Sequence, residues 1–191
     1  MKTIKSFSGE YRFLSNFFPC HLMVLGTAYS TVEHAYQASK TQNLYVKQAI
    51  AACQTPGKAK AFLKDHNDMQ PDAHWTTVYK LETMERLLKL KFDGSQPLLV
   101  QALLKTGKAE LIEGNSHDDI FWGVCGGVGE NYLGRLLMKI RDELRDEKER
   151  IEDLLIKNAG SKKLTAKELK IYERQLYEKI VAYEISYKTG K

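Results

Sequence analysis

Residues 30–40 read STVEHAYQASK, and the character of the chain changes at this stretch. Ser30 and Glu33 are spaced as a capping box, in which Ser30 is the N-cap and Glu33 lies three residues into the helix. The residues that follow are compatible with a helix, so we predict one that begins here and continues through Ala38. The segments before this stretch have the character of short strands and turns, and most of those after it have the character of helices.

Short extended segments precede the predicted helix. Aromatic residues alternate with turn residues over residues 7–18, and residues 22–29 (LMVLGTAY) predict two strands joined at Gly26. Beyond residue 40, apolar residues recur at helical spacing. The further helices are expected over residues 45–53, 56–64, 75–92 and 97–106 and from about Asn131 onward, with a short strand or turn at residues 111–112. The pattern predicts an α+β fold that is predominantly helical, with small N-terminal β elements.

The composition shifts near Arg141, after which charged residues dominate and Leu, Ile and Tyr recur at helical intervals. Residues 158–160 (NAG) predict the end of one helix, and Thr165 with Glu168 predicts a second capping box. We therefore predict a C-terminal hairpin of two antiparallel helices, over residues 141–157 and 165–187. The expected domains are a main domain of residues 1–144 and a charged helical extension of residues 145–191.

The overall composition fits a globular protein of one domain with an appendage. Of its 191 residues 43% are apolar, which is ample for a core, and the formal net charge is +5. This charge permits an anionic partner, although acidic residues are mixed with the basic ones throughout. No apolar run reaches the roughly 18 residues of a membrane span, and the first residues lack the apolar region of a signal peptide. We expect a cytoplasmic protein that does not associate with membranes.

Cysteine and histidine spacing gives no sign of a cross-link or a metal site. Cys20, Cys53 and Cys125 are odd in number, widely spaced and in no CxxC pair, which argues against a disulfide framework and a structural zinc site. The five histidines show no HExxH spacing. The sequence predicts neither a metal site nor a cofactor.

The first cluster with chemical potential combines residues 13–18 (FLSNFF) with the helix of residues 32–40. Glu33, Gln37 and Lys40 lie at positions i, i+4 and i+7, so they project from one face of that helix. A carboxylate, an amide and an ammonium group on one stripe can bind a polar ligand. The alternative is that Glu33 only caps the helix, which is a common structural role.

The second cluster is residues 113–123 (EGNSHDDIFWG), where three carboxylates, a histidine and a tryptophan lie within ten residues. Functional residues concentrate on loops that a rigid scaffold positions. The alternative is an Asx-rich turn in which Asp and Asn side chains bind nearby backbone, with Trp122 as a core residue. The residues alone leave both interpretations open.

The third cluster is residues 126–135 (GGVGENYLGR), a glycine-rich loop that enters a helix. Such a loop can offer free backbone N–H groups to a phosphate, and Arg135 would add a charged fork. It does not match GxGxxG, and no clear strand precedes it, so a dinucleotide-binding fold is disfavoured. The alternative is a flexible loop followed by a solvated arginine.

Together these clusters resemble the YbiA-like, or NADAR, family, from about residue 7 to residue 141. The matching elements are residues 13–19 (FLSNFFP), 32–40 (VEHAYQASK), Met84 with Lys91-Phe92, 103–113 (LLKTGKAELIE), Asp119-x-x-Trp122-Gly123, and 129–141 (GENYLGRLLMKIR). Each element is weak alone, but the six occur in the family's order.

The resemblance implies a mainly helical α+β fold and a hydrolase that cleaves N-glycosidic bonds to ribose phosphates or ADP-ribose. It places Glu33, Asp119 and Trp122 on the family's catalytic positions. Asp118 competes for the acidic role, but Asp119 has the three-residue spacing to the tryptophan. The expected substrate-binding residues are Asn16, Phe17, Lys40, Glu113, Gly129, Asn131 and Arg135.

The resemblance leaves the substrate open. Some family members hydrolyse phosphoribosylamino-pyrimidine intermediates of riboflavin synthesis, and others remove ADP-ribose from guanine in nucleic acid. The lysine-rich C-terminal extension could support a macromolecular substrate such as ADP-ribosylated DNA. A third possibility is a module that binds ADP-ribose or NAD without turnover. The sequence does not indicate the oligomeric state.

Overall fold

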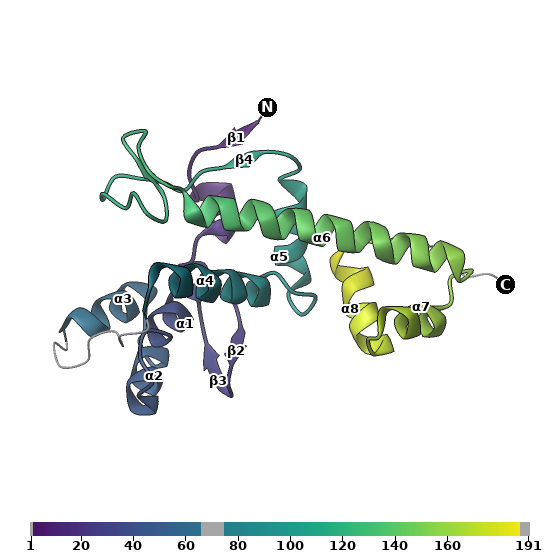
Figure 1. Ribbon diagram of the computed structural model, residues 1–191, viewed down its shortest axis with the longest axis horizontal. Coiled ribbons are helices and arrows are strands. Elements are labelled where there is room, and N and C mark those ends of the chain that lie inside the picture. Colours follow the sequence, from purple (N-terminus) through teal and green to yellow (C-terminus); the bar gives the residue numbers. More distant parts are fainter. Residues whose placement is uncertain (1, 66–74, 188–191) are drawn as a thin grey trace.

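The structure is a computed structural model that describes residues 2–65 and 75–187. Helices dominate it, and the strands are short (Figure 1). The helices are α1 (Val32–Ala38), α2 (Leu44–Ala51), α3 (Pro56–Asp65), α4 (Thr77–Lys91), α5 (Pro97–Lys105), α6 (Tyr132–Lys157), α7 (Lys162–Leu169) and α8 (Glu173–Ala182), with a 3-10 helix at Gly9–Leu14. The strands are β1 (Thr3–Ile4), β2 (Leu22–Val24), β3 (Thr27–Tyr29), β4 (Glu110–Leu111), β5 (Gly114–Asn115) and β6 (Val124–Cys125). This confirms the predicted α+β, predominantly helical fold.

The strands form three separate pairs. β2 and β3 make the predicted antiparallel hairpin, whose two turn residues Leu25 and Gly26 have φ of +48° and +82°. A two-residue hairpin turn of this kind needs positive φ at both positions, which is easy only for Gly26. The other pairs, β1 with β4 and β5 with β6, are parallel and join segments distant in sequence.

The main core surrounds α1, all seven residues of which are buried. α2, α3 and α4 pack against it, and the hairpin adds Leu22 and Tyr29 from its inner face. A helix that is buried all round must satisfy its polar side chains internally or present them to a cavity. Glu33 and Gln37 are such side chains, and they line a cavity.

The start of α1 differs from the prediction. The N-cap is Thr31, whose hydroxyl accepts a hydrogen bond from the His34 backbone N–H at 3.3 Å and lies 2.7 Å from His34 Nδ1. Ser30 is therefore not the cap, and Glu33 is not part of a capping box. The reason is that Thr31, with an extended backbone, places its hydroxyl where it accepts from the free N–H group, which leaves the Glu33 carboxylate available for other partners.

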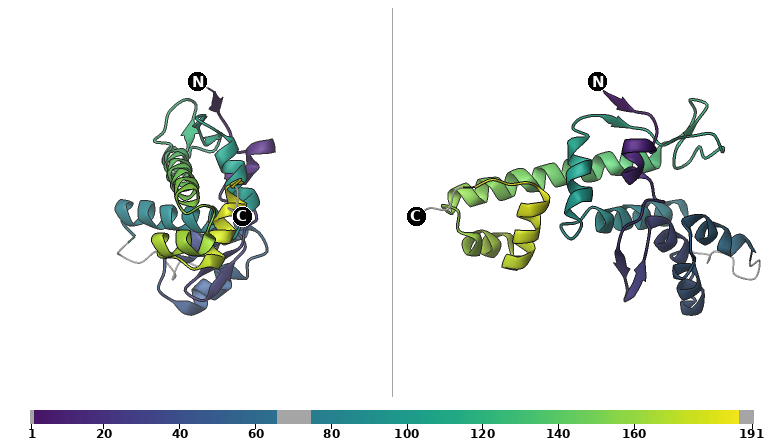
Figure 2. Two further views of the ribbon diagram at one scale, coloured as in Figure 1. Left: turned by 90° about the vertical axis from the view of Figure 1, so that its right-hand side faces the viewer. Right: turned by 180° about the vertical axis from the view of Figure 1, so that it is seen from behind.

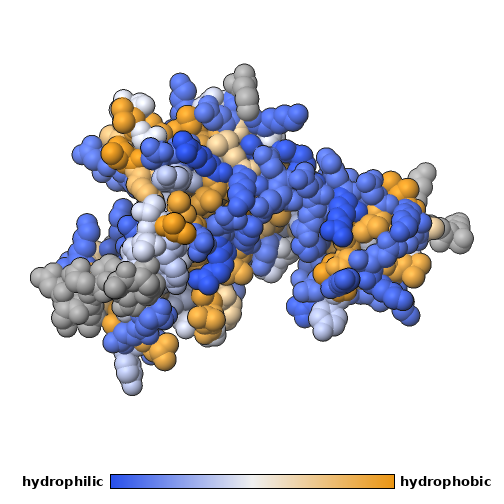
Figure 3. Space-filling view, viewed as in Figure 1, coloured by the Kyte–Doolittle hydropathy of each residue, from blue (hydrophilic) through white to orange (hydrophobic). Residues whose placement is uncertain are grey.

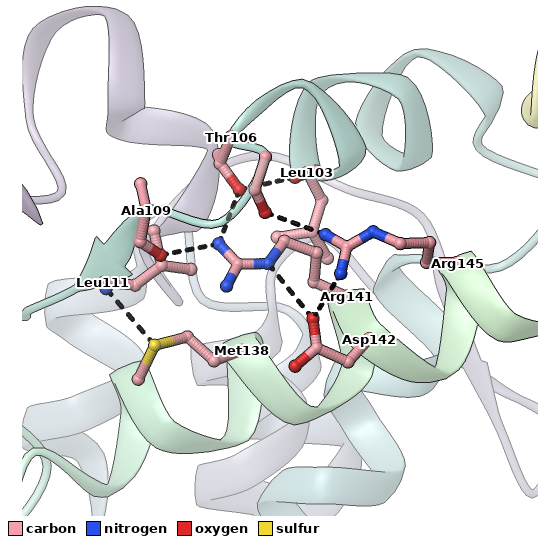
Figure 4. A network of polar contacts seen from close by, with 9 residues as sticks. Leu103, Thr106, Ala109, Leu111, Met138, Arg141, Asp142 and Arg145 are labelled. Atoms are coloured by element: carbon pink, nitrogen blue, oxygen red, sulfur yellow. Dashed lines mark hydrogen bonds and ion pairs between the residues drawn. The ribbon is translucent and has the colours of Figure 1, made fainter. Parts of the chain in front are cut away.

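α6 begins near Asn131 as predicted but does not stop at the main domain. Its 26 residues span about 39 Å, at about 1.5 Å each, and carry the chain to the C-terminal helices (Figures 1 and 2). Buried Arg141 donates to Thr106 Oγ1 and to the Ala109 carbonyl oxygen at 3.0 and 2.8 Å, and Arg145 donates to the Gly107 carbonyl oxygen (Figure 4). These bonds tie α6 to the segment between α5 and β4, near the point where the composition changes.

The C-terminal extension is not a two-helix hairpin. The predicted helix over residues 165–187 is divided into α7 and α8, and Lys170 lies between them in the left-handed region. Ser161 is the N-cap of α7, so the capping box at Thr165 is wrong. Thr165 is instead buried, with its hydroxyl near Asn158 Nδ2 and the Leu154 carbonyl oxygen. This side chain satisfies groups at the end of α6, which no local pattern indicates.

α6 also depends on one glycine where it crosses β4. A Cβ on Gly134 would lie 2.1 Å from the carbonyl oxygen of Leu111. Gly134→Ala is expected to destabilise the protein by about 1–2 kcal/mol, because a backbone overlap costs more than the about 1 kcal/mol that alanine adds to a helix. Thermal unfolding should show a Tm lower by several degrees. The matched control is Gly57→Ala in α3, where a Cβ meets nothing closer than 3.9 Å, and an equal loss there would contradict the argument.

In the described ranges, 2–65 and 75–187, no helix has both the length and the apolar character to cross a membrane.

Candidate functional site

A cavity of about 660 Å³ lies where α1, α3 and α4 meet the loop between β4 and α6. This end of the molecule is opposite α7 and α8 (Figure 2). Its lining residues are Ser15, Asn16, Phe17, Glu33, Tyr36, Gln37, Lys40, Lys60, Trp75, Lys80, Met84, Glu113, His117, Asp119, Phe121, Trp122 and Leu133. A cavity of this size, lined by both aromatic and charged side chains, suits a small molecule with an apolar and a polar part, or part of a larger one.

Glu33, the second residue of α1, is 6% exposed and faces the cavity. Gln37 lies one turn later and donates its Nε2–H to Glu33 Oε1 at 2.7 Å. Burial raises the pKa of Glu33, while the Gln37 bond and the charges of Lys60 and Lys40 oppose the shift. The carboxylate is thus held in one orientation by its own helix.

Glu113 brings a second carboxyl group to the cavity. Burial raises the pKa of Glu113 to about 7, the negative charge of Asp119 acts in the same direction, and Lys91 opposes both. Its backbone N–H donates to Asn131 Oδ1 at 3.0 Å, which ties this position to the start of α6. At neutral pH, a substantial fraction of Glu113 side chains is therefore protonated and can donate a proton.

Asp119 organises the loop around itself. Its Oδ1 accepts from the backbone N–H groups of Trp122 at 2.8 Å and Phe121 at 3.2 Å. Asn115 holds Asp119 by donating to its carbonyl oxygen and accepting from its N–H. Residues 113–123 are therefore both an Asx-rich turn and part of the candidate site, because Asp119 forms an Asx-type turn and also lines the cavity.

Aromatic rings form one wall. Tyr36 on α1 makes edge-to-face contacts with Trp75 and Trp122, at centroid distances of 5.3 and 5.5 Å, and Phe121 contacts Trp122 at 4.9 Å. Burial and the nearby carboxylates raise the pKa of Tyr36, so its phenol stays protonated. Such rings provide a flat surface on which a base can stack.

Three lysines line the same cavity: Lys40 from the turn after α1, Lys60 from α3 and Lys80 from α4. Lys40 Nζ lies over the Tyr36 ring at 5.4 Å, and burial lowers the pKa of Lys40. Three cationic groups around one cavity favour an anionic ligand.

Among the described residues, four buried side-chain polar atoms lack a hydrogen-bond partner, and three of them belong to lining residues: Asn16 Oδ1, Gln37 Oε1 and Glu113 Oε2. An unpaired buried polar atom costs about 1–3 kcal/mol unless something binds it. Two of the atoms are amide oxygens, which are hydrogen-bond acceptors, so a ligand with hydroxyl or amino donors would satisfy them.

Lys91 supports the site from behind. Its side chain is completely buried, and Nζ donates to the Ser15 carbonyl oxygen at 2.7 Å. Burial lowers the pKa of Lys91 to about 7. This contact fixes the turn that carries Asn16 and Phe17.

The cavity brings together seven of the ten residues predicted from the sequence. These are Asn16, Phe17, Glu33, Lys40, Glu113, Asp119 and Trp122. Asp118 does not line it; its backbone has φ of +58° and its carboxylate lies beside Cys125 Sγ at 3.6 Å. The geometry therefore favours Asp119 over Asp118.

Gly129, Asn131 and Arg135 are not among the lining residues. Asn131 is nevertheless close behind the site, because its side chain bridges the Glu113 N–H and the Leu111 carbonyl oxygen. Arg135 has a side chain 60% exposed, with Nη1 3.7 Å from a carboxylate oxygen of Glu130. Their contact with substrate remains a prediction.

The prediction that the glycine-rich loop before α6 offers free backbone N–H groups is wrong. The N–H groups of Glu130, Asn131 and Tyr132 donate to the carbonyl oxygens of Ile120, Gly123 and Phe121. The loop therefore folds back on residues 120–123, and these N–H groups are not free to bind a phosphate.

Sequence reasoning assigned no individual role to several lining residues, chiefly Tyr36, Lys60, Trp75, Lys80, His117 and Phe121. Gln37 was grouped with Glu33 and Lys40 by helical spacing but was not among the expected site residues. Lys60 and Lys80 carried none, because they reach the cavity only through the packing of α3 and α4 on α1. The described residues contain no group of three or more His, Cys, Asp or Glu side chains that could hold a metal ion.

Comparison with known families gives two matches. Residues 4–145 match the NADAR domain, and residues 143–183 match the bacterial regulatory proteins of the Fis family.

Individual relatives are similar over 71% to 78% of this chain. An N-glycosidase of Nostoc punctiforme is 37% identical over 141 residues, which cover 71% of this chain and 87% of the relative. A riboflavin biosynthesis protein of Vibrio vulnificus is 37% identical over 138 residues, but these cover 36% of that longer protein and 72% of this chain. The NMR structure of Escherichia coli YbiA matches with a TM-score of 0.65 and 32% identity, covering 78% of this chain and 89% of that one.

Proposed function

The chain belongs to the NADAR family, and from this we propose that it is a hydrolase that cleaves the N-glycosidic bond between a nitrogen base and a ribose phosphate or ADP-ribose. The observation that carries the proposal is the composition of the cavity, which combines three carboxyl groups, an aromatic wall and three lysines. Relatives named N-glycosidase align over most of their length, which supports the same reaction.

The reaction needs opposite charges at its two ends. When the C1′–N bond breaks, its electron pair goes to the base, positive charge develops on C1′ and the oxygen of a water molecule adds there. In our proposal Glu33 stabilises this positive charge or takes the proton from the water. Asp119 acts as its partner by orienting the water or the ribose hydroxyls. Both are carboxyl groups held by fixed hydrogen bonds, which preorganises them.

Glu113 supplies the proton for the leaving base in this proposal. It lines the cavity, it has a buried oxygen without a partner, and its pKa is raised to about 7. A carboxyl group that donates a proton beside a second carboxyl group with another role is the division of roles that glycoside hydrolysis requires. Glu113, expected from the sequence to bind substrate, thus also becomes the candidate general acid.

The remaining lining residues bind substrate. Trp122 and its aromatic neighbours stack on the base or on one face of the ribose, while Asn16 and Gln37 accept hydrogen bonds from hydroxyl or amino groups. Lys60 and Lys80 bind the phosphate, with Lys40 beside the Tyr36 ring.

Lys60→Ala and Lys80→Ala are each expected to raise KM by about 10-fold or more with little change in kcat, because a charge-assisted hydrogen bond contributes about 1.5–3 kcal/mol. Steady-state kinetics would measure this on a ribosyl phosphate and on the same compound without its phosphate. The effect should vanish for the second compound. Lys58→Ala is the matched control, since Lys58 lies on the same helix but bonds Gln54 and does not line the cavity.

A mass-spectrometric product assay on the purified protein tests the proposed reaction. The two substrates offered in parallel are a phosphoribosylamino-pyrimidine and an oligonucleotide with ADP-ribosylated guanine. Release of ribose 5-phosphate from the first is our expectation, in agreement with the riboflavin biosynthesis names among the relatives. Tight binding of ADP-ribose or NAD without any product would contradict the enzyme and favour a binding module.

Removal of ADP-ribose from guanine in DNA is the second candidate. The C-terminal extension favours it, because its exposed lysines Lys163, Lys167 and Lys170 suit a polyanionic substrate. Release of ADP-ribose from the oligonucleotide alone would establish it in place of the small-molecule reaction.

We also propose that residues 1–144 and 145–191 are separate functional units. The two family matches support this division, although α6 runs through both units and the second hydrophobic cluster includes Val100 of α5. The cytoplasmic location expected from the sequence stays a prediction.

A further inference from the structure

Tyr36 lines the cavity with a hydroxyl group that the proposed reaction does not use. It lies on α1 three residues after Glu33, so both side chains project from one face of the helix. Its side chain is 5% exposed, and the ring is held by edge-to-face contacts with Trp75 and Trp122 at centroid distances of 5.3 and 5.5 Å. A ring packed in this way has little freedom to move, so its hydroxyl group is positioned before a ligand binds.

The Tyr36 hydroxyl lies near both carboxylates that act at C1′ in the proposed reaction. Burial raises the pKa of Tyr36, and the negative charges of Glu33 and Asp119 raise it further, whereas a hydrogen bond from the Trp122 side chain opposes the shift. The phenol therefore stays protonated throughout the physiological pH range, and it can donate a hydrogen bond.

The proton of this hydroxyl is left for a ligand. The indole N–H of Trp122 can only donate, so the Tyr36 oxygen is the acceptor in the bond between them. That bond is the only one that the described residues give this phenol. Both nearby carboxylates are held by other donors, Glu33 by Gln37 and Asp119 by the Trp122 backbone.

The surroundings of the hydroxyl favour an uncharged acceptor. Glu33 and Asp119 would repel an anionic group such as a phosphate, which the lysines of the cavity attract instead. Hydrophobic side chains gather on the loop between β4 and α6, which forms one side of the cavity, while the outward face of α6 is mostly hydrophilic (Figure 3). A hydrogen bond is stronger in such surroundings than in open water.

A hydroxyl group of the ribose fits these requirements, because it can accept from Tyr36 and donate to a carboxylate at the same time. The 2′-hydroxyl is on the carbon next to C1′, where Glu33 and Asp119 act in the proposed reaction. Hydrogen bonds to the hydroxyl at this position strengthen in the transition state of glycoside hydrolysis.

We propose that Tyr36 is a specificity residue, whose phenol donates to the 2′-hydroxyl oxygen of the ribose and turns the proton of that hydroxyl toward Glu33 or Asp119. The inference rests on the proposed function, since it places C1′ between these two carboxylates. It goes further by naming the sugar that the site accepts.

The contact makes the site selective for ribose over 2′-deoxyribose. With a deoxyribosyl compound the buried phenol has no acceptor, and a site built to bind a hydroxyl group rejects a ligand that lacks it. The protein should therefore leave intact the bonds between bases and deoxyribose in DNA. This holds for both candidate substrates, because the ribose of ADP-ribose also carries a 2′-hydroxyl.

Tyr36→Phe tests the proposal, because it removes the hydroxyl and keeps the ring contacts with Trp75 and Trp122. On a phosphoribosylamino-pyrimidine, kcat/KM should fall by about 10–100-fold, mostly through kcat. On the 2′-deoxy analogue the variant and the unaltered protein should differ by less than about 3-fold, since the partner of the lost hydroxyl is already absent. The matched control is Tyr132→Phe, whose ring contacts Phe121 at 4.8 Å without lining the cavity, and it should equal the unaltered protein on both compounds.

A binding measurement separates this proposal from the proposed reaction, because it needs no turnover. In calorimetric titrations the unaltered protein should bind ribose 5-phosphate about 3–10-fold more tightly than 2-deoxyribose 5-phosphate, and Tyr36→Phe should lose this preference. The preference without any hydrolysis would contradict the proposed function but support the contact of Tyr36 with the 2′-hydroxyl. Hydrolysis with equal losses on both pyrimidine compounds, or equal binding of the two sugar phosphates by the unaltered protein, would overturn the contact.

Discussion

Glu33→Gln is expected to lower kcat by about 10²–10⁴, the usual loss for a positioned acid–base or charge-stabilising group. The glutamine has the same shape and can still accept the hydrogen bond from Gln37 Nε2, so the helix and the cavity should keep their geometry. Substrate binding should change little, because the lost interaction strengthens only as charge develops on C1′.

Stability provides the internal control for this variant. Burial raises the pKa of Glu33, so the protonated side chain contributes to the stability of the fold at low pH. This contribution is lost as the pH rises through the raised pKa. At neutral pH the native protein therefore carries the cost of a buried carboxylate, which glutamine removes. The Tm of Glu33→Gln at pH 7 should equal or exceed that of the unaltered protein. Near-normal turnover in this folded variant would exclude Glu33 from the chemistry.

Glu113→Gln is expected to remove the alkaline limb of the pH–rate profile. The acid must be protonated to act, and with a pKa of about 7 the rate of the unaltered protein should fall as the pH rises above 7. The rate should also fall at acidic pH, as Glu33 becomes protonated. In Glu113→Gln only the acidic limb should remain, and kcat for an amine-linked pyrimidine should drop by about 10²–10⁴.

The leaving group distinguishes a general acid from a binding residue. A pyridinium base, as in nicotinamide ribose 5′-phosphate, leaves as a neutral molecule and needs no proton. Glu113→Gln should therefore hydrolyse such a substrate nearly as well as the unaltered protein. Equal losses on both substrates would show that Glu113 only binds or positions.

Asp119→Asn is the companion variant. In the unaltered protein the negative charge of Asp119 helps to raise the pKa of Glu113, whereas the charge of Lys91 lowers it. Removing Asp119's charge should move the alkaline limb to lower pH. Asparagine keeps an oxygen that can accept from Trp122 N–H, so the turn should persist. An alkaline limb that stays in place would mean that another group produces it.

Site residues that share one helix or one loop could largely be predicted from the sequence. Glu33, Gln37 and Lys40 could be grouped by helical spacing, and Glu113, Asp119 and Trp122 by their place in one loop. The resemblance to a family then put these two groups in one site. Lys60 and Lys80 could not be found in this way, since their nearness to Glu33 arises only when α3 and α4 pack on α1.

Local pattern by itself determined the α+β class, the hairpin around Gly26 and the positions of most helices to within about two residues, because helical periodicity, turn residues and caps act over a few neighbours. Only the tertiary structure decided which hydroxyl caps α1, that α6 continues past Arg141 and that the extension is divided at Lys170. It also decided that the amides of residues 130–132 are occupied and that Glu113 is buried beside Asp119. The common reason is that the energy of a buried hydrogen bond or charge depends on partners far away in sequence, and those partners meet only after the chain has folded.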